Sequence, residues 1–240
     1  RNPVQHSGAL MNTANSDVVA RIPNLWLGGG RPYNSLLTSR HDGRLFLADM
    51  MADPKLDVAD RNVSVPHHLV VFDALTGKEH CRIKTDEPVV GFREGAFSDD
   101  GRYVAVIPIP KAQNSRAGVI SRIIVWDNEL QQIVDRLDDP RPPHDDTQRV
   151  EGLAFSADAR RLVIWQHNGL VILWDRATKK RVLEIRADDK PVRSAAMSRD
   201  GRWLAASTDG QVLLWNAATG ELVFKIGNNF KTAYELNFTA

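Results

Sequence analysis

The side chains with the widest capacity for chemistry lie in three long connecting segments of this 240-residue chain, at 51–68, 108–121 and 138–148. Among their polar, charged and imidazole members are Asp57, Asp60, Arg61, His67, His68, Lys111, Asn114, Arg116, Arg141, His144, Asp145 and Asp146. Imidazole and carboxylate groups suit zinc or another transition metal, so His67 or His68 could share an ion with His144 and a neighbouring aspartate. The spacing is not the tight spacing of a ligand set. The sequence therefore favours solvated loop residues over a metal site, and we expect no metal or other cofactor.

Docking of a protein or peptide fits these segments better than metal binding does. Their charge is mixed, and Pro140, Pro142 and Pro143 stiffen the third segment, which lowers the entropy lost when a partner binds. The residues predicted to contact a partner are Asp60, Arg61, His67, His68, Lys111, Arg116, Arg141, His144 and Asp145.

Known catalytic motifs are absent from the sequence. There is no Gly-x-Ser-x-Gly elbow, no His-Glu-x-x-His motif and no carboxylate pair that spacing alone would bring together. Cys81 lies in the outermost strand expected for the first repeat, which predicts a small packing or edge residue and not a nucleophile. The glycine run 28–30 could cradle a phosphate, but Arg31 and Pro32 lead into a strand instead of a helix, so we predict a loop.

The elements that must position the three segments are repeated antiparallel sheets. Residues 191–226 contain four short apolar runs separated by Asp200-Gly201, Asp209-Gly210 and Thr219-Gly220, a pattern typical of strands joined by tight turns. The same plan recurs upstream about every forty residues, with Trp174 aligned to Trp215. A repeat of this length with four strands per unit predicts an all-β fold, a β-propeller.

The repeats predict a tail or linker at residues 1–18 and a partial propeller over 19–240. The blades are expected at about 33–85, 89–137, 149–186 and 191–227, with a fifth beginning near 233. Four blades and the start of a fifth do not close a ring, so we expect a longer propeller, completed by further sequence or by another chain. The first residue is Arg1, and we expect a leader or an upstream domain before it.

The ends of the third strands carry a family resemblance: Phe72-Asp73, Trp126-Asp127, Trp174-Asp175 and Trp215-Asn216. Together with the Ser-x-Asp-Gly-Arg turns, they resemble bacterial WD-repeat proteins. The resemblance implies a non-enzymatic scaffold that binds proteins. It also implies a buried hydrogen-bonded set of His, Ser or Thr, Asp and Trp in each blade. Ser207, Asp209 and Trp215 hold these positions in the last blade, with Asp188 in place of the His. The preceding blades hold parts of the set at Asn168, Trp174 and Trp126.

Antiparallel connectivity predicts where the three long segments emerge. Loops that leave second strands and loops that leave fourth strands leave a propeller from the same face. The first two segments follow second strands and the third follows a fourth strand, so all three should share one face. Long loops grouped on a rigid scaffold commonly carry binding function.

The amino-acid composition limits the classes of partner that we expect. The chain has 31 basic and 30 acidic residues, a net charge of +1, which gives no electrostatic reason to expect nucleic acid or an anionic membrane. No apolar run reaches the length of a membrane span. The single cysteine fits a reducing compartment, so we expect a cytoplasmic protein, with export from a bacterium left open.

A second class of function stays open. The chain could be the propeller of a larger enzyme, either housing a cofactor or capping a catalytic domain elsewhere. Thr76-Gly77-Lys78 and Thr219-Gly220-Glu221 resemble the repeats of quinone-dependent dehydrogenases, although here the Trp precedes the Thr-Gly pair instead of following it. Flanking domains would distinguish the two classes.

Overall fold

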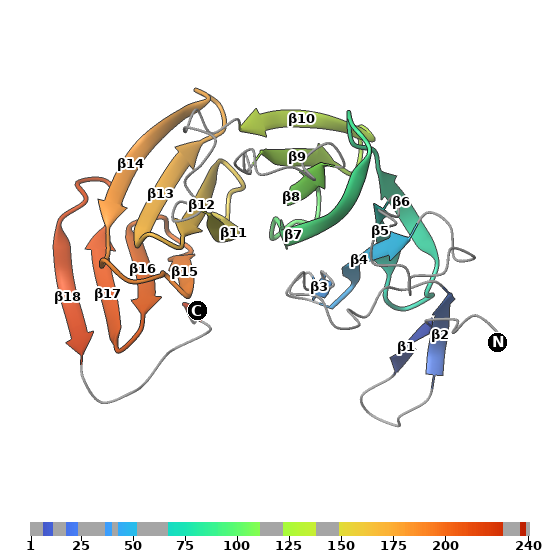
Figure 1. Ribbon diagram of the computed structural model, residues 1–240, viewed down its shortest axis with the longest axis horizontal. Coiled ribbons are helices and arrows are strands. Elements are labelled where there is room, and N and C mark those ends of the chain that lie inside the picture. Colours follow the sequence, from blue (N-terminus) through green and yellow to red (C-terminus); the bar gives the residue numbers. More distant parts are fainter. Residues whose placement is uncertain are drawn as a thin grey trace.

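The chain folds into four antiparallel blades arranged side by side in an arc, in a computed structural model (Figure 1). The structure describes residues 7–11, 18–23, 37–39, 43–51, 67–110, 122–137, 149–227 and 236–238. All regular elements in these ranges are strands. No helix among them is long and apolar enough to cross a membrane.

Each blade contains four strands in chain order, with the first strand nearest the centre of the arc (Figure 1). Blade 1 consists of β3 (Leu37–Ser39), β4 (Leu45–Met51), β5 (His67–Asp73) and β6 (Glu79–Ile83). Blade 2 consists of β7 (Val89–Phe97), β8 (Tyr103–Pro110), β9 (Ile123–Asp127) and β10 (Gln132–Leu137). Blade 3 consists of β11 (Val150–Phe155), β12 (Arg161–Gln166), β13 (Leu170–Asp175) and β14 (Lys180–Arg186). Blade 4 consists of β15 (Ser194–Met197), β16 (Trp203–Thr208), β17 (Gln211–Asn216) and β18 (Leu222–Gly227).

The predicted antiparallel four-stranded blades are therefore confirmed, and the described residues do not close a ring. Blades 1 and 2 are additionally joined by one residue pair, His67 with Val89. After β18 the chain returns to the centre of the arc, where the amide of Leu236 donates a hydrogen bond of 3.0 Å to Oγ of Ser194. The predicted start of a fifth blade thus lies beside the innermost strand of blade 4.

The N-terminal residues differ from the predicted tail. β1 (Ser7–Met11) and β2 (Val18–Pro23) form an antiparallel pair, with Ser7 opposite Pro23. The sequence pattern did not indicate this pair, because its strands show little of the alternation that marks a half-buried sheet and the residues around them are polar. The glycine run at 28–30 lies outside the described residues.

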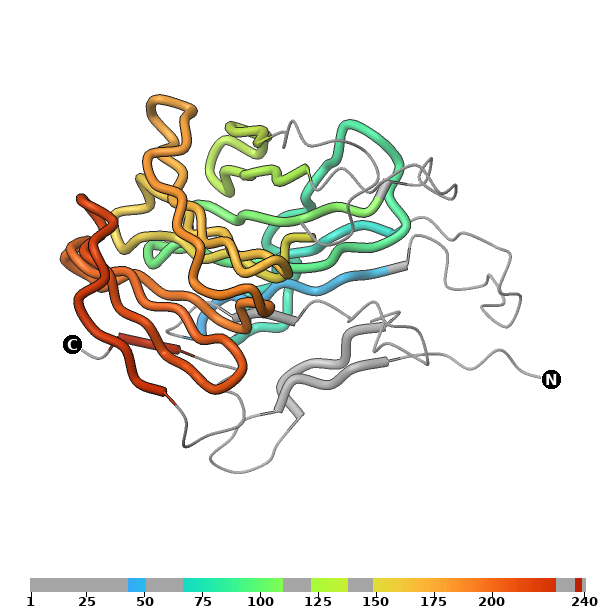
Figure 2. Tube along the Cα trace, turned by 60° about the vertical axis from the view of Figure 1, so that its left-hand side comes forward, coloured from blue at the N-terminus to red at the C-terminus, as the bar shows by residue number. Residues whose placement is uncertain are grey.

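Apolar cores lie between neighbouring blades and hold the arc together. One cluster joins blades 1 and 2 around Trp126, a second joins blades 2 and 3 around Leu162, and a third joins blades 3 and 4 around Trp215. Trp126 and Trp215 are almost fully buried, as expected for residues at the ends of third strands. The sheets lie side by side, as Figure 2 shows for the strands of blades 2 to 4. Each sheet therefore covers a face of its neighbour.

Candidate interaction surface

The ends of the strands that flank the first two long connectors lie together. The register pairs Met51 with His67, His67 with Val89, and Val89 with Pro110. Met51 and His67 flank the first connector, and Pro110 precedes the second. These two connectors therefore start from one edge of blades 1 and 2.

The third connector starts from the same edge. β9 begins at Ile123, directly after the second connector, and Ile123 pairs with Leu137, the last residue of β10. The third connector follows Leu137. We call this edge the connector edge: the strand ends at Met51, His67, Pro110, Ile123 and Leu137. The connectors themselves, at 52–66, 111–121 and 138–148, lie outside the described residues.

His67 is engaged by a carboxylate at the connector edge. Its Nδ1 lies 2.8 Å from Oδ1 of Asp49, and the two side chains are only 10% and 3% exposed. Burial of both partners makes this pair part of the scaffold, because a buried carboxylate requires a partner. The expected contact between His67 and a partner would therefore have to be made with little exposed surface.

His68 points into a more open group of side chains. Nη1 of Arg82 donates to Nε2 of His68 at 2.9 Å, and Arg82 also pairs with Glu79 at 2.8 Å. Burial, together with the nearby Arg82 charge, lowers the pKa of His68, so its ring is neutral at pH 7 and accepts the hydrogen bond. His68 is thus a neutral member of a group with the charged side chains of Arg82 and Glu79.

The other predicted contact residues, Asp60, Arg61, Lys111, Arg116, Arg141, His144 and Asp145, lie outside the described residues. The metal interpretation also depends on His144 and its neighbours. Among the residues that the structure describes, no group of three His, Cys, Asp or Glu side chains could hold an ion.

The corresponding edges of blades 3 and 4 carry ion pairs at the innermost strand of each sheet. In blade 3, Nδ1 of His167 lies 2.7 Å from Oε1 of Glu151, which also pairs with Arg149. Although burial raises it, the hydrogen bonds from Arg149 and His167 bring the pKa of Glu151 below its usual value. In blade 4, Arg193 binds both carboxylate oxygens of Asp209, at 3.0 and 3.1 Å.

Asp209 is therefore held by Arg193, a different partner from the one the resemblance implies. Oγ of Ser207 lies 3.5 Å from the carbonyl oxygen of Ser194, and Oγ1 of Thr208 donates to Asp188 at 3.1 Å. The substitution of Asp188 for the His explains this change, because two carboxylates, Asp188 and Asp209, cannot pair with each other.

Blades 2 and 3 retain parts of the same set without the complete network. Asn168 accepts a hydrogen bond from the amide of Leu170 at 3.2 Å. Trp174 is half-buried between sheets, and Trp126 is buried in the junction between blades 1 and 2. The indoles therefore contribute through packing.

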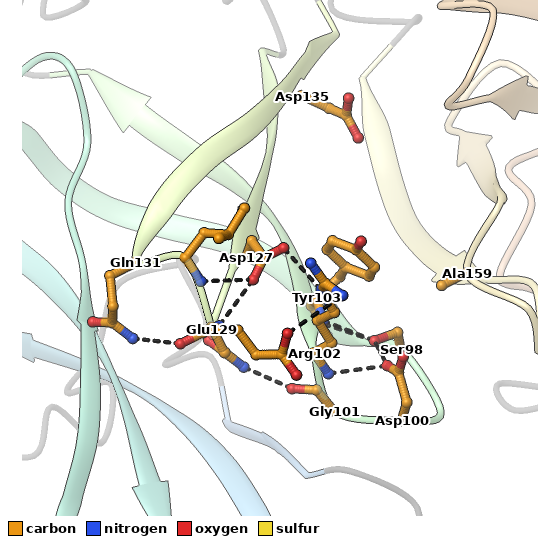
Figure 3. Close-up of polar contacts among 12 residues, drawn as sticks. Ser98, Asp100, Gly101, Arg102, Tyr103, Asp127, Glu129, Gln131, Asp135 and Ala159 are labelled. Atoms are coloured by element: carbon orange, nitrogen blue, oxygen red, sulfur yellow. Dashed lines mark hydrogen bonds and ion pairs between the residues drawn. The ribbon is translucent and has the colours of Figure 1, made fainter.

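The opposite edge of the blades is built from a repeated Ser-x-Asp turn between first and second strands, drawn for blade 2 in Figure 3. Oγ of Ser98 donates to Asp100 at 2.5 Å and accepts from the amide of Tyr103 at 2.9 Å. Blades 3 and 4 repeat both bonds, from Ser156 and from Ser198. The short side chains thus replace backbone hydrogen bonds that a tight turn cannot make.

In blades 1 to 3 the carboxylate that ends the third strand shapes the next turn, and in blade 4 the amide oxygen of Asn216 takes its place. Asp127 accepts from the amides of Glu129 and Leu130, and also from Nε of Arg102 at 2.9 Å (Figure 3). Asp73 and Asp175 accept from Thr76 and Thr178 in the same way. The Trp-Asp dipeptide therefore combines a buried ring with a capped turn.

One contact between blades 2 and 3 was not predicted. Arg176 donates from Nε to Oδ2 of Asp135 at 2.7 Å, and its guanidinium lies 4.0 Å from the ring centre of Tyr103. Lys179 also pairs with Asp135. Residues more than forty positions apart form this contact, so only the repeat register could have indicated it.

The four blades and their capped turns define an all-β fold of four-stranded antiparallel blades arranged as in a propeller. Residues 179–216 match the family described as WD domain, G-beta repeat, a span that runs from the start of β14 to the end of β17. This match supports the WD-repeat family for the chain.

Two curated proteins show related sequences. Periodic tryptophan protein 2 of Arabidopsis thaliana is 30% identical over 128 residues, 52% of this chain and 14% of that protein. Retinoblastoma-binding protein 5 homolog of Drosophila melanogaster is 36% identical over 73 residues, 30% of this chain and 15% of that protein. The chain thus aligns with only a small part of each relative. Both come from eukaryotes, so the bacterial type of the resemblance gains no support from them.

Proposed function

We propose that the chain is a non-enzymatic scaffold that binds a protein or peptide at the connector edge. The observation that carries this proposal is the register of blades 1 and 2, which brings the flanks of three long connectors to one edge. Rigid blades hold these flanks, and such a scaffold lowers the entropy lost on binding.

Charge at this edge favours a polar, mixed-charge partner segment. His68 and Arg82 contribute at blade 1, and the proposed contacts from the connectors are Asp60, Arg61, Lys111, Arg116, Arg141, His144 and Asp145. Similarity to WD-repeat proteins agrees with such a role, since the proteins that share this fold commonly act through their loops.

The experiment replaces residues 53–65, or residues 111–121, with a tight Asn-Gly turn. Long surface insertions add little stability, so both variants should fold with an unchanged circular dichroism spectrum. We expect each variant to lose most of the partners captured by the natural chain in pull-downs analysed by mass spectrometry. A matched control changes Leu130, an exposed residue of the opposite edge, to Ser. Unchanged capture by both connector variants would contradict the proposal.

A further inference from the structure

Blade 3 carries an excess of positive charge on its two turns at the edge opposite the connectors. Residues 156–161 and 175–181 include six basic and two acidic side chains, a net charge of +4. The equivalent residues of blade 2, 98–103 and 127–133, include one basic and four acidic side chains, a net charge of −3. Adjacent blades built on one plan thus present opposite charge at the same edge.

Three of the six cations are already paired. Arg176 and Lys179 bind Asp135 of blade 2, and Nη1 of Arg181 lies 3.1 Å from Oε2 of Glu184. We call the other three the basic group of blade 3: Arg160, Arg161 and Lys180.

The fold itself does not need a cation at residue 161. The register places this position opposite the last residue of the third strand in every blade. The other three blades hold an apolar or aromatic residue there: Leu45, Tyr103 and Trp203. Arg161 is therefore a departure from the repeat, and closing the turn does not explain its charge.

Asp175 lies between the two strand residues of the basic group. It pairs with Arg161 in β12 and with Lys180 in β14, and directly opposite residues share one face of a sheet. Its Oδ1 already accepts the amide and the hydroxyl of Thr178, at 2.8 and 2.9 Å. These two bonds, with a smaller effect from the charge of Arg161, hold the pKa of Asp175 below its usual value. One carboxylate that is engaged in its own turn therefore stands between two cations.

Arg160 extends into solvent, unlike its equivalent in blade 2. Arg102 donates to Asp127 at 2.9 Å, and its side chain is 37% exposed. Arg160 lies 3.9 Å from Asp158, and its side chain is 81% exposed. Its backbone is nevertheless fixed, because its carbonyl oxygen accepts the amide of Arg176 at 2.9 Å. A solvent-exposed cation thus starts from a well-held turn.

We propose that the basic group of blade 3 binds an acidic peptide segment of a partner protein. Arg161 offers a planar guanidinium that can bind a carboxylate through two hydrogen bonds, and Lys180 offers a point charge on the other side of Asp175. Arg160, from the adjoining turn, extends the group along the edge. This surface lies opposite the connector edge and does not depend on the function proposed there.

The acidic turns of blade 2 lie beside the basic group and limit the length of the bound anion. The guanidinium of Arg176 lies 4.0 Å from the ring centre of Tyr103 in blade 2, and Figure 3 shows Tyr103 and Asp100 near Ala159 of the blade 3 turn. A nucleic acid carries a charge at every nucleotide, so its backbone would meet Asp100 and Glu129 as it leaves the basic group. A short run of glutamate or aspartate residues avoids this repulsion.

The test measures the fluorescence anisotropy of a labelled octaglutamate peptide with the full chain at low ionic strength. The variant combines Arg160→Gln, Arg161→Gln and Lys180→Gln, which removes the three charges without adding carboxylates next to Asp175. We expect it to bind the peptide about tenfold more weakly than the natural chain does. High salt should remove most of the difference, because exposed charges are screened. Equal affinities at low ionic strength would overturn the proposal.

The matched control removes three exposed lysines elsewhere, with Lys84→Gln, Lys190→Gln and Lys225→Gln. The net charge changes by the same amount, so the affinity should stay within about twofold of that of the natural chain. A loss as large as that of the first variant would show attraction by overall charge alone and would contradict a site on blade 3. If the first variant unfolds, Arg160→Gln with Lys180→Gln, both at exposed positions, gives the same comparison.

A single-stranded oligouridylate of the same charge distinguishes a peptide site from a nucleic acid site. The acidic turns of blade 2 should make its affinity lower than that of octaglutamate. Asp99→Asn with Glu129→Gln should narrow this gap, and an unchanged gap would contradict the role of blade 2. Tighter binding of oligouridylate than of octaglutamate to the natural chain, lost in the variant of the basic group, would assign the surface to nucleic acid and overturn the proposal.

Discussion

Ala159 occupies a backbone conformation that its neighbours in the repeat assign to glycine. Its φ is +55°, and the equivalent Gly101 and Gly201 have φ values of +75° and +71°. A left-handed conformation costs a residue with a Cβ about 1–2 kcal/mol, whereas glycine adopts it freely. The turn of blade 3 therefore holds Ala159 in a conformation that alanine disfavours. The hydrogen bonds made by Ser156 and Asp158 maintain this turn.

Ala159→Gly should stabilise the protein. The free energy released by relieving the backbone strain exceeds the free energy lost with one buried methyl group. We therefore expect the free energy of unfolding to rise by about 0.5–1 kcal/mol. Urea unfolding followed by tryptophan fluorescence measures the change.

The matched control is Gly201→Ala, the reverse change at the equivalent turn. A Cβ on residue 201 meets no atom within 4 Å, so any loss of stability comes from backbone conformation alone. We expect a loss of about 1 kcal/mol. A stabilised Gly201→Ala variant would contradict this account of the turns.

Glu94 in β7 makes stability depend on pH near neutrality. Burial raises its pKa to about 7, and the charge of Glu151 in the neighbouring blade adds to the effect. Because the folded-state pKa lies above the unfolded value of 4.5, the folded protein binds this proton more tightly than the unfolded chain does. The stabilisation from the protonated carboxyl is complete below pH 4.5 and is lost as pH rises through 7.

Glu94→Gln should remove this dependence. A neutral amide of the same shape carries no charge to desolvate, so the variant should gain up to about 3 kcal/mol over the natural chain between pH 4.5 and pH 8. Urea unfolding at both pH values measures the difference. The control is Glu184→Gln, at an exposed position of β14. Its free energy of unfolding should stay close to that of the natural chain at both pH values. The same gain at pH 4.5 as at pH 8 would show that the effect comes from packing.

At the scale of elements, side chains from strands of one blade and turns of the next hold the blades in register. Arg176, after β13, reaches Asp135 in β10, and also donates to the carbonyl oxygen of Ala159 at 2.6 Å. Burial lowers the pKa of Arg176, although its guanidinium stays charged at neutral pH. Asp135 is 3% exposed, so its charge depends on Arg176 and Lys179.

Arg176→Ala should destabilise the protein by about 2–4 kcal/mol, because it leaves a buried carboxylate with one cation in place of two. The measurement is the midpoint of urea unfolding at pH 7. Arg160→Ala is the control, since Arg160 is 81% exposed and lies 3.9 Å from Asp158, and it should change stability by less than about 0.5 kcal/mol.

A double variant separates the charge from the packing. Asp135→Leu combined with Arg176→Ala imitates the apolar junction of Leu183 and Ala217 between blades 3 and 4, and should recover most of the stability lost in Arg176→Ala. A double variant no more stable than Arg176→Ala would show that this junction needs its charges for another reason.

The sequence predicts elements better than it predicts the contacts between them. Short apolar runs and Asp-Gly or Thr-Gly turns mark the strands of blades 2 to 4, because both signals are local. The pair of β1 and β2 was not predicted, since its strands lack alternation and the residues around them are polar. The contact of Arg176 with Asp135 could not be predicted either. Two residues in neighbouring blades have no fixed spacing in the sequence until the register of the strands is known.

The candidate site divides in the same way. Connectivity predicts that three connectors leave one edge, and the strand ends that flank them do lie together. The role of His67 could not be read in advance, because Asp49 lies in a different strand and only the register brings the two together. In the sequence, Asp49 and His67 stand at opposite ends of the first long segment with nothing to link them.

For the whole molecule, stability should vary along the arc, because each blade contacts only its neighbours. Blade 3 is packed on both faces, in the clusters around Leu162 and Trp215, whereas β18 of blade 4 is exposed along its entire length. Local opening needs less free energy where fewer apolar contacts break. Blade 4 should therefore open before blade 3 does.

Hydrogen exchange followed by mass spectrometry measures this gradient. We expect amides of β18 to exchange about ten to a hundred times faster than amides of β14, although both are fourth strands with similar hydrogen bonding to a third strand. Arg176→Ala weakens the junction on the far side of blade 3, so it should accelerate exchange in β10 more than in β18. Equal protection of β14 and β18 would mean that the four blades unfold as a single unit, and the molecule would then behave as one cooperative domain and not as a series of coupled repeats.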